Sequence, residues 1–389
     1  MAVYYVDKGV GPGGAGTEGD PFDSILDAFD ACFPLEGDPA TRQPLAEDTT
    51  VYLTTSTNEA DVIGDAATVY YTGSNTLTLI QTDRTSAVWD DTKYRVVRAN
   101  GEVFSTSGDG GSLASETHRM TCLNLQIEQS SNSADNQVVI DTPGRARRGN
   151  FIFHSVIIKG SGDDTYSKRV IRLRGDDRFA AAVWFINSVV FNMGNAGGSV
   201  FFAGLASSDC PTITFIANST FNCPGMLLLS RLTQPEGFDR VFIYNNIINA
   251  SGYGTKRNSP STNVITTDYN TCFFEDEDDV DGETVLWTHG ANDIVNVASL
   301  PFTNAANGDF RLSSTDANVV DQGDDFSTGF ETPPAKSGTA GQPSDVPGWD
   351  YDHLETNTRP QGAAWDIGAY EFIAPEVFNY PRFLMGPKA

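Results

Sequence analysis

The chain has 389 residues with 37 glycines and an apolar fraction of 39%, which is typical of many short strands joined by turns. Its formal net charge is −26, from 51 acidic and 25 basic residues. Such a surface repels nucleic acids and anionic membranes, and it disfavours polyuronates unless cations bridge the carboxylates. No apolar run reaches the roughly 18 residues of a membrane-spanning helix, so we expect no membrane insertion.

The N-terminal region predicts one strand and one helix. Residues 3–7 (VYYVD) alternate and precede a glycine-rich turn. Asp20 then stands before Pro21, a favourable N-cap ahead of a proline at the first helical position. Apolar residues follow at helical spacing, namely Phe22, Ile25, Leu26, Phe29 and Phe33. We predict an amphipathic helix over 21–33 that covers the open end of a β-stack.

Strand-like segments follow from Thr49 to about Phe104. They read TTVYLTT, ATVYYT, TLTLIQT and YRVVRA, and glycine, asparagine or aspartate residues bound each one. Such bounded runs, rich in β-branched and aromatic residues, predict short strands.

A short pattern then returns six times, at intervals of 25 to 33 residues. It reads apolar–x–Asn–small–x–apolar, with its centres at Asn124, His154, Asn187, Asn218, Asn245 and Asn270. A strand-plus-turn repeat at this period predicts a solenoid, in which equivalent positions stack. We expect Ile157, Val190, Phe221 and Ile248 to form an inward column. The central residues are expected at corners in a structural role, because asparagine tolerates a left-handed backbone.

Five cysteines occur without CxxC spacing, so neither a disulfide framework nor a zinc site is expected. We predict small, buried, apolar roles for those inside or beside the repeats. The five are Cys32, Cys122, Cys210, Cys223 and Cys272.

Three segments carry a family resemblance. The opening (YYVD…GGAGTEGDPFDSILDAF), the stretch GDFRLSSTDANVVDQGDD, and Asp350, Arg359 and residues 366–371 (DIGAYE) resemble right-handed parallel β-helix proteins of the pectate-lyase-like superfamily. The resemblance implies an all-β fold, a single-stranded right-handed parallel β-helix with an N-terminal capping helix and a C-terminal closing segment. The resemblance says little about function, because proteins with this fold have many different activities.

The expected domains follow from this resemblance and from the changes in composition. Residues 1–48 form the N-terminal strand and capping helix, and 49–323 form the β-helix coils. Residues 324–372 form the closing segment. The last segment, 373–389, holds three prolines and is predicted to be an extended arm. Its apolar side chains are candidates for partner binding, namely Phe378, Tyr380, Phe383 and Leu384.

A mixed basic and acidic cluster is the candidate catalytic site. Polysaccharide lyases of the resembling family use a Lys or Arg base together with carboxylate-bound calcium. The residues that would match these roles are Lys159, Asp163, Asp164, Arg169, Arg172 and Arg174. The alternative is an exposed ladder of salt bridges without a function.

An acidic run is the candidate metal site. It consists of Glu275, Asp276, Glu277, Asp278, Asp279 and Asp281. Clustered carboxylates can take up calcium, although the spacing is not that of an EF-hand loop. The alternative is a solvated acidic loop, so calcium is the one ion suggested and no cofactor is required.

Two functions compete most closely. Proteins of the resembling type act outside cells, yet the chain begins without a recognisable export signal. We therefore expect a virion structural protein at the particle surface, such as a capsid decoration, fibre or spike component. Its partners would be other virion proteins, further copies of itself (a trimer, for example) or a host polysaccharide. The alternative is an extracellular polysaccharide lyase or glycoside hydrolase, and a bacterial adhesin is a third reading.

Overall fold

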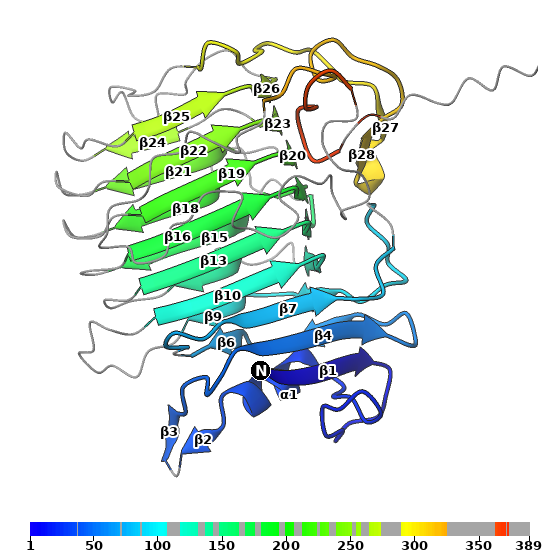
Figure 1. Ribbon diagram of the computed structural model, residues 1–389, viewed down its shortest axis with the longest axis vertical. Coiled ribbons are helices and arrows are strands. Elements are labelled where there is room, and N and C mark those ends of the chain that lie inside the picture. The colour runs from blue at the N-terminus through cyan, green and yellow to red at the C-terminus, as the bar shows by residue number, and fades with distance from the viewer. Residues whose placement is uncertain are drawn as a thin grey trace, which may run out of the picture.

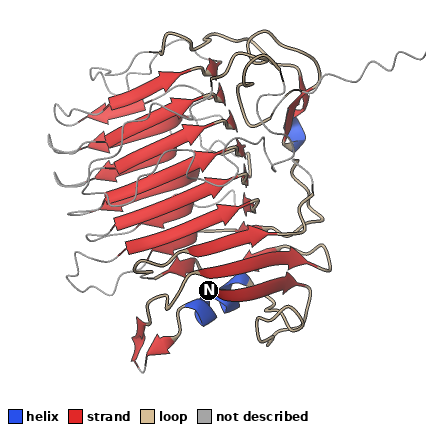
Figure 2. Cartoon of the chain, viewed as in Figure 1, coloured by secondary structure: helices blue, strands red, loops and turns tan. Residues whose placement is uncertain are grey.

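The computed structural model describes residues 1–36, 38–70, 72–85, 88–106, 117–130, 137–142, 148–162, 168–175, 180–193, 199–205, 212–223, 226–232, 239–250, 254–257, 264–273, 289–324, 362–370 and 372. Most of these residues lie in strands and the turns between them, with one α-helix and one 3₁₀ helix in this part of the chain (Figure 2). The fold is therefore all-β, as predicted. No helix among the described residues has the length and apolarity to cross a membrane.

Three parallel sheets make up most of the fold (Figure 1). The chain visits them in a fixed order, and each strand pairs in parallel with the strand of the same sheet from the previous visit. We call one visit to the three sheets a rung. The strands predicted in TTVYLTT, ATVYYT, TLTLIQT and YRVVRA are confirmed as β4, β6, β7 and β8.

The first sheet consists of β1 (Ala2–Lys8), β4 (Thr49–Thr55), β7 (Leu77–Gln81), β10 (Thr117–Leu123), β13 (Arg148–His154), β16 (Ala180–Ile186), β19 (Thr212–Ala217), β22 (Asp239–Tyr244) and β25 (Val264–Asp268). The second sheet consists of β5 (Asp61–Ile63), β8 (Val96–Arg98), β11 (Gln126–Gln129), β14 (Ile157–Gly160), β17 (Val189–Phe191), β20 (Thr220–Asn222), β23 (Ile247–Asn249) and β26 (Thr271–Cys272). The third consists of β6 (Ala67–Val69), β9 (Glu102–Thr106), β12 (Gln137–Thr142), β15 (Lys168–Gly175), β18 (Ser199–Leu205), β21 (Met226–Leu232) and β24 (Gly254–Arg257). Outside the stack, β2 (Leu35–Glu36) pairs with β3 (Asp38–Arg42), and β27 (Phe302–Asn304) pairs with β28 (Asp309–Leu312) across η1 (Ala305–Asn307).

The corner between the first and second sheets repeats its backbone shape from β10 onward. One residue there is left-handed, with φ between 50° and 59°: Asn124, Ser155, Asn187, Asn218, Asn245 and Tyr269. The predicted corner is thus confirmed in four rungs and wrong by one residue at His154 and Asn270. Strand register is the reason at His154. Leu123 pairs with His154 in the sheet, so the residues that follow them, Asn124 and Ser155, form the two corners.

From Ser188 onward, the residue after the corner joins neighbouring rungs through its side chain. Backbone N–H groups donate to side-chain oxygens one rung later: Val156 to Ser188 (3.1 Å), Ser188 to Ser219 (3.1 Å), Ser219 to Asn246 (2.9 Å), Asn246 to Asn270 (3.0 Å) and Asn270 to Asp293 (2.7 Å). A buried backbone donor without an acceptor costs about 1–3 kcal/mol. We call this series the corner ladder, and it gives Asn270, one of the predicted central residues, the structural role that was expected of it.

The interior between the sheets is apolar and continuous. One column of fully buried side chains in the second sheet runs Ile127, Ile158, Val190, Phe221, Ile248 and Cys272. Ile157 was predicted in this column, but the corner register turns it to the outer face, where it packs with Phe310 and Tyr370.

The cysteines have the predicted structural role wherever the structure describes them. Cys32, Cys122, Cys223 and Cys272 are buried and form no disulfide. Burial raises the pKa of the Cys32 thiol to about 12. Cys210 lies outside the described residues.

The predicted N-terminal helix exists but is shorter, as α1 (Ile25–Cys32). Its N-cap is Ser24, whose Oγ accepts the Asp27 N–H at 3.3 Å, whereas Asp20 was predicted. The reason is that Phe22 extends the edge of β1 instead: its N–H donates to the Tyr5 carbonyl at 2.9 Å. That pairing requires extended backbone where the sequence pattern predicted helix.

α1 lies at the N-terminal end of the stack (Figure 1). Phe29 and Phe33 pack into the core, and Phe29 stacks on Phe104 with ring centres 6.2 Å apart. Beneath the first turn, the buried Asp61 carboxylate accepts the Ile25 N–H at 2.7 Å and the Tyr94 hydroxyl at 2.8 Å. Burial raises the pKa of Asp61 despite these hydrogen bonds.

The opposite end of the stack is closed by polar contacts. Ile294 bridges Thr271 in parallel, so the second sheet continues past β26. Next to it, Asp293 accepts hydrogen bonds from Thr267 Oγ1 (2.7 Å) and Asn270 N–H (2.7 Å). Burial raises the pKa of Asp293, but hydrogen bonds from His289, Thr267, Asn270 and Gly290 outweigh burial and lower it below its usual value.

Candidate functional site

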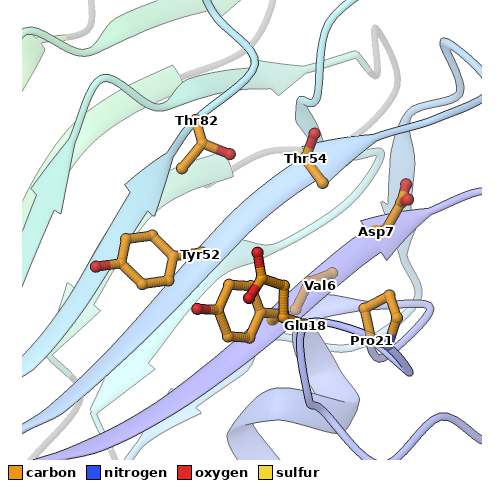
Figure 3. Close-up of a pocket in the computed structure, with 8 residues that line it drawn as sticks. Val6, Asp7, Glu18, Pro21, Tyr52, Thr54 and Thr82 are labelled. Atoms are coloured by element: carbon orange, nitrogen blue, oxygen red, sulfur yellow. The ribbon is translucent and has the colours of Figure 1, made fainter.

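A pocket of about 450 Å³ lies on the outer face of the first sheet, near the N-terminal end (Figure 3). Its volume falls within the range of about 300–1,000 Å³ that is typical of small-ligand sites. It is lined by Tyr5, Val6, Asp7, Glu18, Pro21, Tyr52, Thr54 and Thr82.

Strand alternation determines which side chains of β1 and β4 face this pocket. Val6, Val51 and Leu53 are fully buried in the core. Because successive residues of a strand point to opposite faces, Tyr5 and Tyr52 point outward. The same rule places the next alternate residues, Asp7 and Thr54, on this outer face.

Parallel pairing then brings these side chains together across the strands. Tyr5 pairs with Tyr52, and Asp7 pairs with Thr54. The two tyrosine rings lie 5.3 Å apart between centres, at an angle of 34°. Thr82 follows β7, and its N–H donates to the Leu53 carbonyl at 2.9 Å, which continues the sheet beside Thr54. The floor of the pocket is therefore an aromatic pair beside a polar column.

The loop between β1 and α1 supplies the remaining wall, with Glu18 and Pro21. Glu18 lies in a tight turn, in which Thr17 and Asp20 exchange backbone hydrogen bonds of 3.1 and 3.2 Å. The Tyr5 N–H donates to the Gly16 carbonyl at 2.9 Å and holds this turn against β1. Glu18 is thus presented to the pocket by a hydrogen-bonded loop.

Two glycines permit this loop conformation. Gly16 has φ of +74°, and a Cβ there would lie 2.2 Å from the Phe22 ring. A Cβ on Gly14 would lie 1.8 Å from the Pro21 carbonyl oxygen. Larger side chains at either position would displace the loop that carries Glu18.

The pocket combines two kinds of recognition group. Tyrosine rings offer flat apolar faces with a polar hydroxyl. Asp7 and Glu18 provide carboxylate acceptors, and Thr54 and Thr82 provide hydroxyl groups. Flat rings beside several hydrogen-bonding groups match the surface of a sugar, which has apolar C–H faces and hydroxyl edges. The described residues contain no group of three or more His, Cys, Asp or Glu side chains that could hold a metal.

Lys159, a candidate catalytic base, is engaged in structural contacts elsewhere. It lies on β14, where its Nζ is 3.1 Å from a Glu128 carboxylate oxygen and 4.7 Å from the centre of the Trp89 ring. The other basic candidates belong to the third sheet: Arg169 is half-buried on β15, and Arg172 and Arg174 lie on the same strand. Lys159 therefore lies in a different sheet from the three arginines.

The remaining predicted site residues lie outside the described residues. These are Asp163 and Asp164, the acidic run Glu275, Asp276, Glu277, Asp278, Asp279 and Asp281, and the arm residues Phe378, Tyr380, Phe383 and Leu384. Calcium binding by the acidic run and partner binding by the arm stay predictions.

The pocket residues were not among the sequence candidates. Alternation within VYYVD and TTVYLTT is the available signal, since it places Tyr5 with Asp7, and Tyr52 with Thr54. Their pairing requires the register between β1 and β4, and the position of Glu18 requires the loop conformation. Neither follows from periodicity alone.

The function of this pocket has to be inferred from its own chemistry. No protein-family model matches the chain, no curated protein matches it in sequence, and no solved structure matches its fold.

Proposed function

We propose that this chain is a virion structural protein, built on a right-handed parallel β-helix, that binds glycans through the pocket described above. The observation that carries glycan binding is the paired Tyr5 and Tyr52 platform bordered by Asp7 and Glu18. Stacking on aromatic faces and hydrogen bonding to carboxylates are complementary to a sugar ring and its hydroxyls.

Two features support the β-helix. The chain visits the three parallel sheets in constant order, which is the connectivity that coils of such a helix need. Equivalent residues also stack from rung to rung, as the corner ladder and the interior column do. The resemblance of the opening, the 308–325 stretch and residues 366–371 to parallel β-helix proteins points the same way.

A role on a virus particle is supported by rigidity. Backbone N–H groups after the corners are bonded to side chains of the next rung from Val156 to Asn270, and both ends of the stack are covered, by α1 and by the segment around Ile294. A stiff, acidic rod suits display on a particle surface, where it extends a binding pocket towards a host glycan.

Two experiments test this proposal separately. A glycan array probed with the purified protein should give specific binders, and Tyr52→Ala should remove them, with Tyr52→Phe as the matched variant that keeps the ring. Mass spectrometry of purified particles should detect the chain, and deletion of residues 373–389 should prevent its incorporation without unfolding the stack. Absence of array binding contradicts the glycan role, and normal loading of the truncated chain contradicts the role of the arm.

A polysaccharide lyase or glycoside hydrolase is the second candidate. The observation that favours it is a pair of carboxylates, Asp7 and Glu18, in one pocket, because most glycosidases act through two carboxyl groups. A panel of alginate, pectin and bacterial capsule polysaccharides would be assayed for new reducing ends and for unsaturated ends that absorb ultraviolet light. If one of these polysaccharides is cleaved and Glu18→Gln abolishes the cleavage, the pocket is a catalytic site and not only a binding site.

A further inference from the structure

We infer that the pocket recognises a sugar that carries a free amino group, in preference to neutral and uronic acid sugars. This inference rests on the proposed glycan-binding function and adds the charge class of the ligand. It is argued from the charge of the lining, from the carboxylate oxygens that remain available, and from the arrangement of the tyrosine rings.

The charge of the lining is wholly negative. Asp7 and Glu18 are acidic, and no Lys, Arg or His is among the described residues that line the pocket. The whole chain carries a formal charge of −26, so its field attracts cations over the same surface. An anionic sugar would meet two carboxylates without a compensating positive group.

The carboxylates of this pocket have oxygens to offer to a ligand. One oxygen of Asp7 accepts the Ser56 N–H at 2.6 Å, which fixes the side chain. Within the described residues, no hydrogen bond or ion pair engages the other oxygen of Asp7 or either oxygen of Glu18. An ammonium group is a donor in all its N–H bonds, and its charge strengthens each hydrogen bond to a carboxylate.

The aromatic pair adds a second site of attraction for a cation. Ring faces carry negative charge density, and a cation within about 6 Å of a ring centre is stabilised. Tyr5 and Tyr52, with centres 5.3 Å apart and a mutual angle of 34°, present adjacent surfaces in one pocket. The same ring surfaces can pack against the C–H face of a sugar ring. A single amino sugar can therefore contact both the tyrosine rings and the carboxylates.

The pocket is also organised before any ligand arrives. Glu18 lies in the turn held by Thr17 and Asp20, and Gly16 bonds this turn to β1 through Tyr5. A fixed acceptor loses little conformational freedom on binding. It therefore favours selective binding more than an acceptor on a mobile loop would.

The experiment uses isothermal titration calorimetry of the full chain with four probes. They are a glucosamine tetrasaccharide, its fully N-acetylated counterpart, a galacturonate tetrasaccharide and free choline. We expect the amine form to bind at least about tenfold more tightly than the N-acetylated form, with no binding of galacturonate. Raising the salt from about 0.05 M to about 0.5 M should weaken only the amine form, because screening acts on charge pairs.

Variants connect the effect to the pocket. Glu18→Gln should remove most of the preference for the amine, and Glu59→Gln, an exposed acidic residue outside the pocket lining, should leave it unchanged. Equal affinity for amine and N-acetyl forms would overturn the inference while leaving glycan binding intact. Choline binding as tight as that of the amine sugar would also overturn it, because the sugar ring would then add nothing. If no probe binds and the array is empty, the proposed function itself fails.

Discussion

The outer faces of the first and second sheets differ in what covers them. On the second sheet, one outward column is buried from β11 to β26: Gln126, Ile157, Val189, Thr220, Ile247 and Thr271. On the first sheet, Tyr5 and Tyr52 are only half-buried beside an open pocket.

The covering of the second sheet comes from two distant parts of the chain. The segment after β7 contributes Asp90, whose N–H donates to Gln126 Oε1 at 2.8 Å. The C-terminal segment contributes Ala369, whose N–H donates to Thr220 Oγ1 at 3.2 Å. Between them, the buried Arg84 guanidinium donates to the carbonyls of the corner residues Asn124 (2.8 Å) and Ser155 (2.7 Å).

This difference separates scaffold from binding surface. Gln126 and Thr220 on the covered face of the second sheet are matched by other parts of the chain, so changing them should alter stability. Polar groups of the pocket include carboxylate oxygens without such a match, so changing them should alter binding. The predictions below test that separation, and their expected effects on stability decrease in order.

Truncation of the covered face should have the largest effect. Ile247 is 3% exposed and packs against Val319 and Ile367. Ile247→Ala should lower the free energy of unfolding by about 3 kcal/mol, because it leaves a cavity. The matched control is Val62→Ala on the same sheet, where the side chain is 65% exposed and the change should stay within about 0.5 kcal/mol. Chemical denaturation measures both, and equal losses would contradict the assignment of a covered face.

Loss of one step of the corner ladder should have the next largest effect. Asn246 accepts the Ser219 N–H at 2.9 Å and donates to the Ile216 carbonyl at 2.9 Å. Asn246→Ala should cost about 2 kcal/mol, since it leaves buried groups unsatisfied. Asn246→Ser should recover part of this loss, because serine occupies the equivalent position in the rung of Ser219. A serine variant no more stable than the alanine variant would show that the ladder contributes little.

A change in the pocket loop should have a small effect on stability and a large effect on glycan binding. Gly16→Ala forces a left-handed φ on alanine and a contact with Phe22, at a cost of about 1 kcal/mol in unfolding free energy. Its main result should be lost glycan affinity, because Glu18 moves with the loop. Gly11→Ala is the control, since a Cβ there has no heavy atom within 4 Å. Titration calorimetry that finds both variants binding equally well would exclude a role for the loop.

The sequence predicts those features of the structure that depend on residues close together in the chain. Alternation and turn residues predict β4 and β7 correctly, and asparagines mark four of the six corners. The corner was misplaced by one residue at Asn270, because asparagine serves at the corner in some rungs and in the ladder position after it in others. Asn270, for example, accepts the Asn246 N–H. The corner was misplaced at His154 because His154 pairs with Leu123 inside the strand, which puts the corner at Ser155. The site was missed because it joins β1, β4 and a loop whose relative positions are set by packing.

The two ends of the stack should respond oppositely to acid. Asp61, under α1, has a pKa raised by burial, so its stabilising contribution is present below its unfolded pKa of about 3.9 and is lost as the pH rises through its folded value. Asp293 has a lowered pKa, so its contribution is present above about pH 3.9 and is lost as the pH falls through its folded value.

Acidification from neutral pH to about pH 4 should therefore strengthen the α1 end, and further acidification should loosen the end around Ile294. Hydrogen exchange read by mass spectrometry would follow Phe33, whose N–H donates to Phe29, and Cys272, whose N–H donates to Ile294 at 2.7 Å. Asp293→Asn should abolish the acid response of the Ile294 end only, because its neutral amide no longer titrates in this range. Its single oxygen replaces one of the two acceptor oxygens of Asp293, so this end should also be less stable at every pH. Parallel loss of protection at both ends would mean that the global charge, rather than these two carboxylates, controls the response to acid.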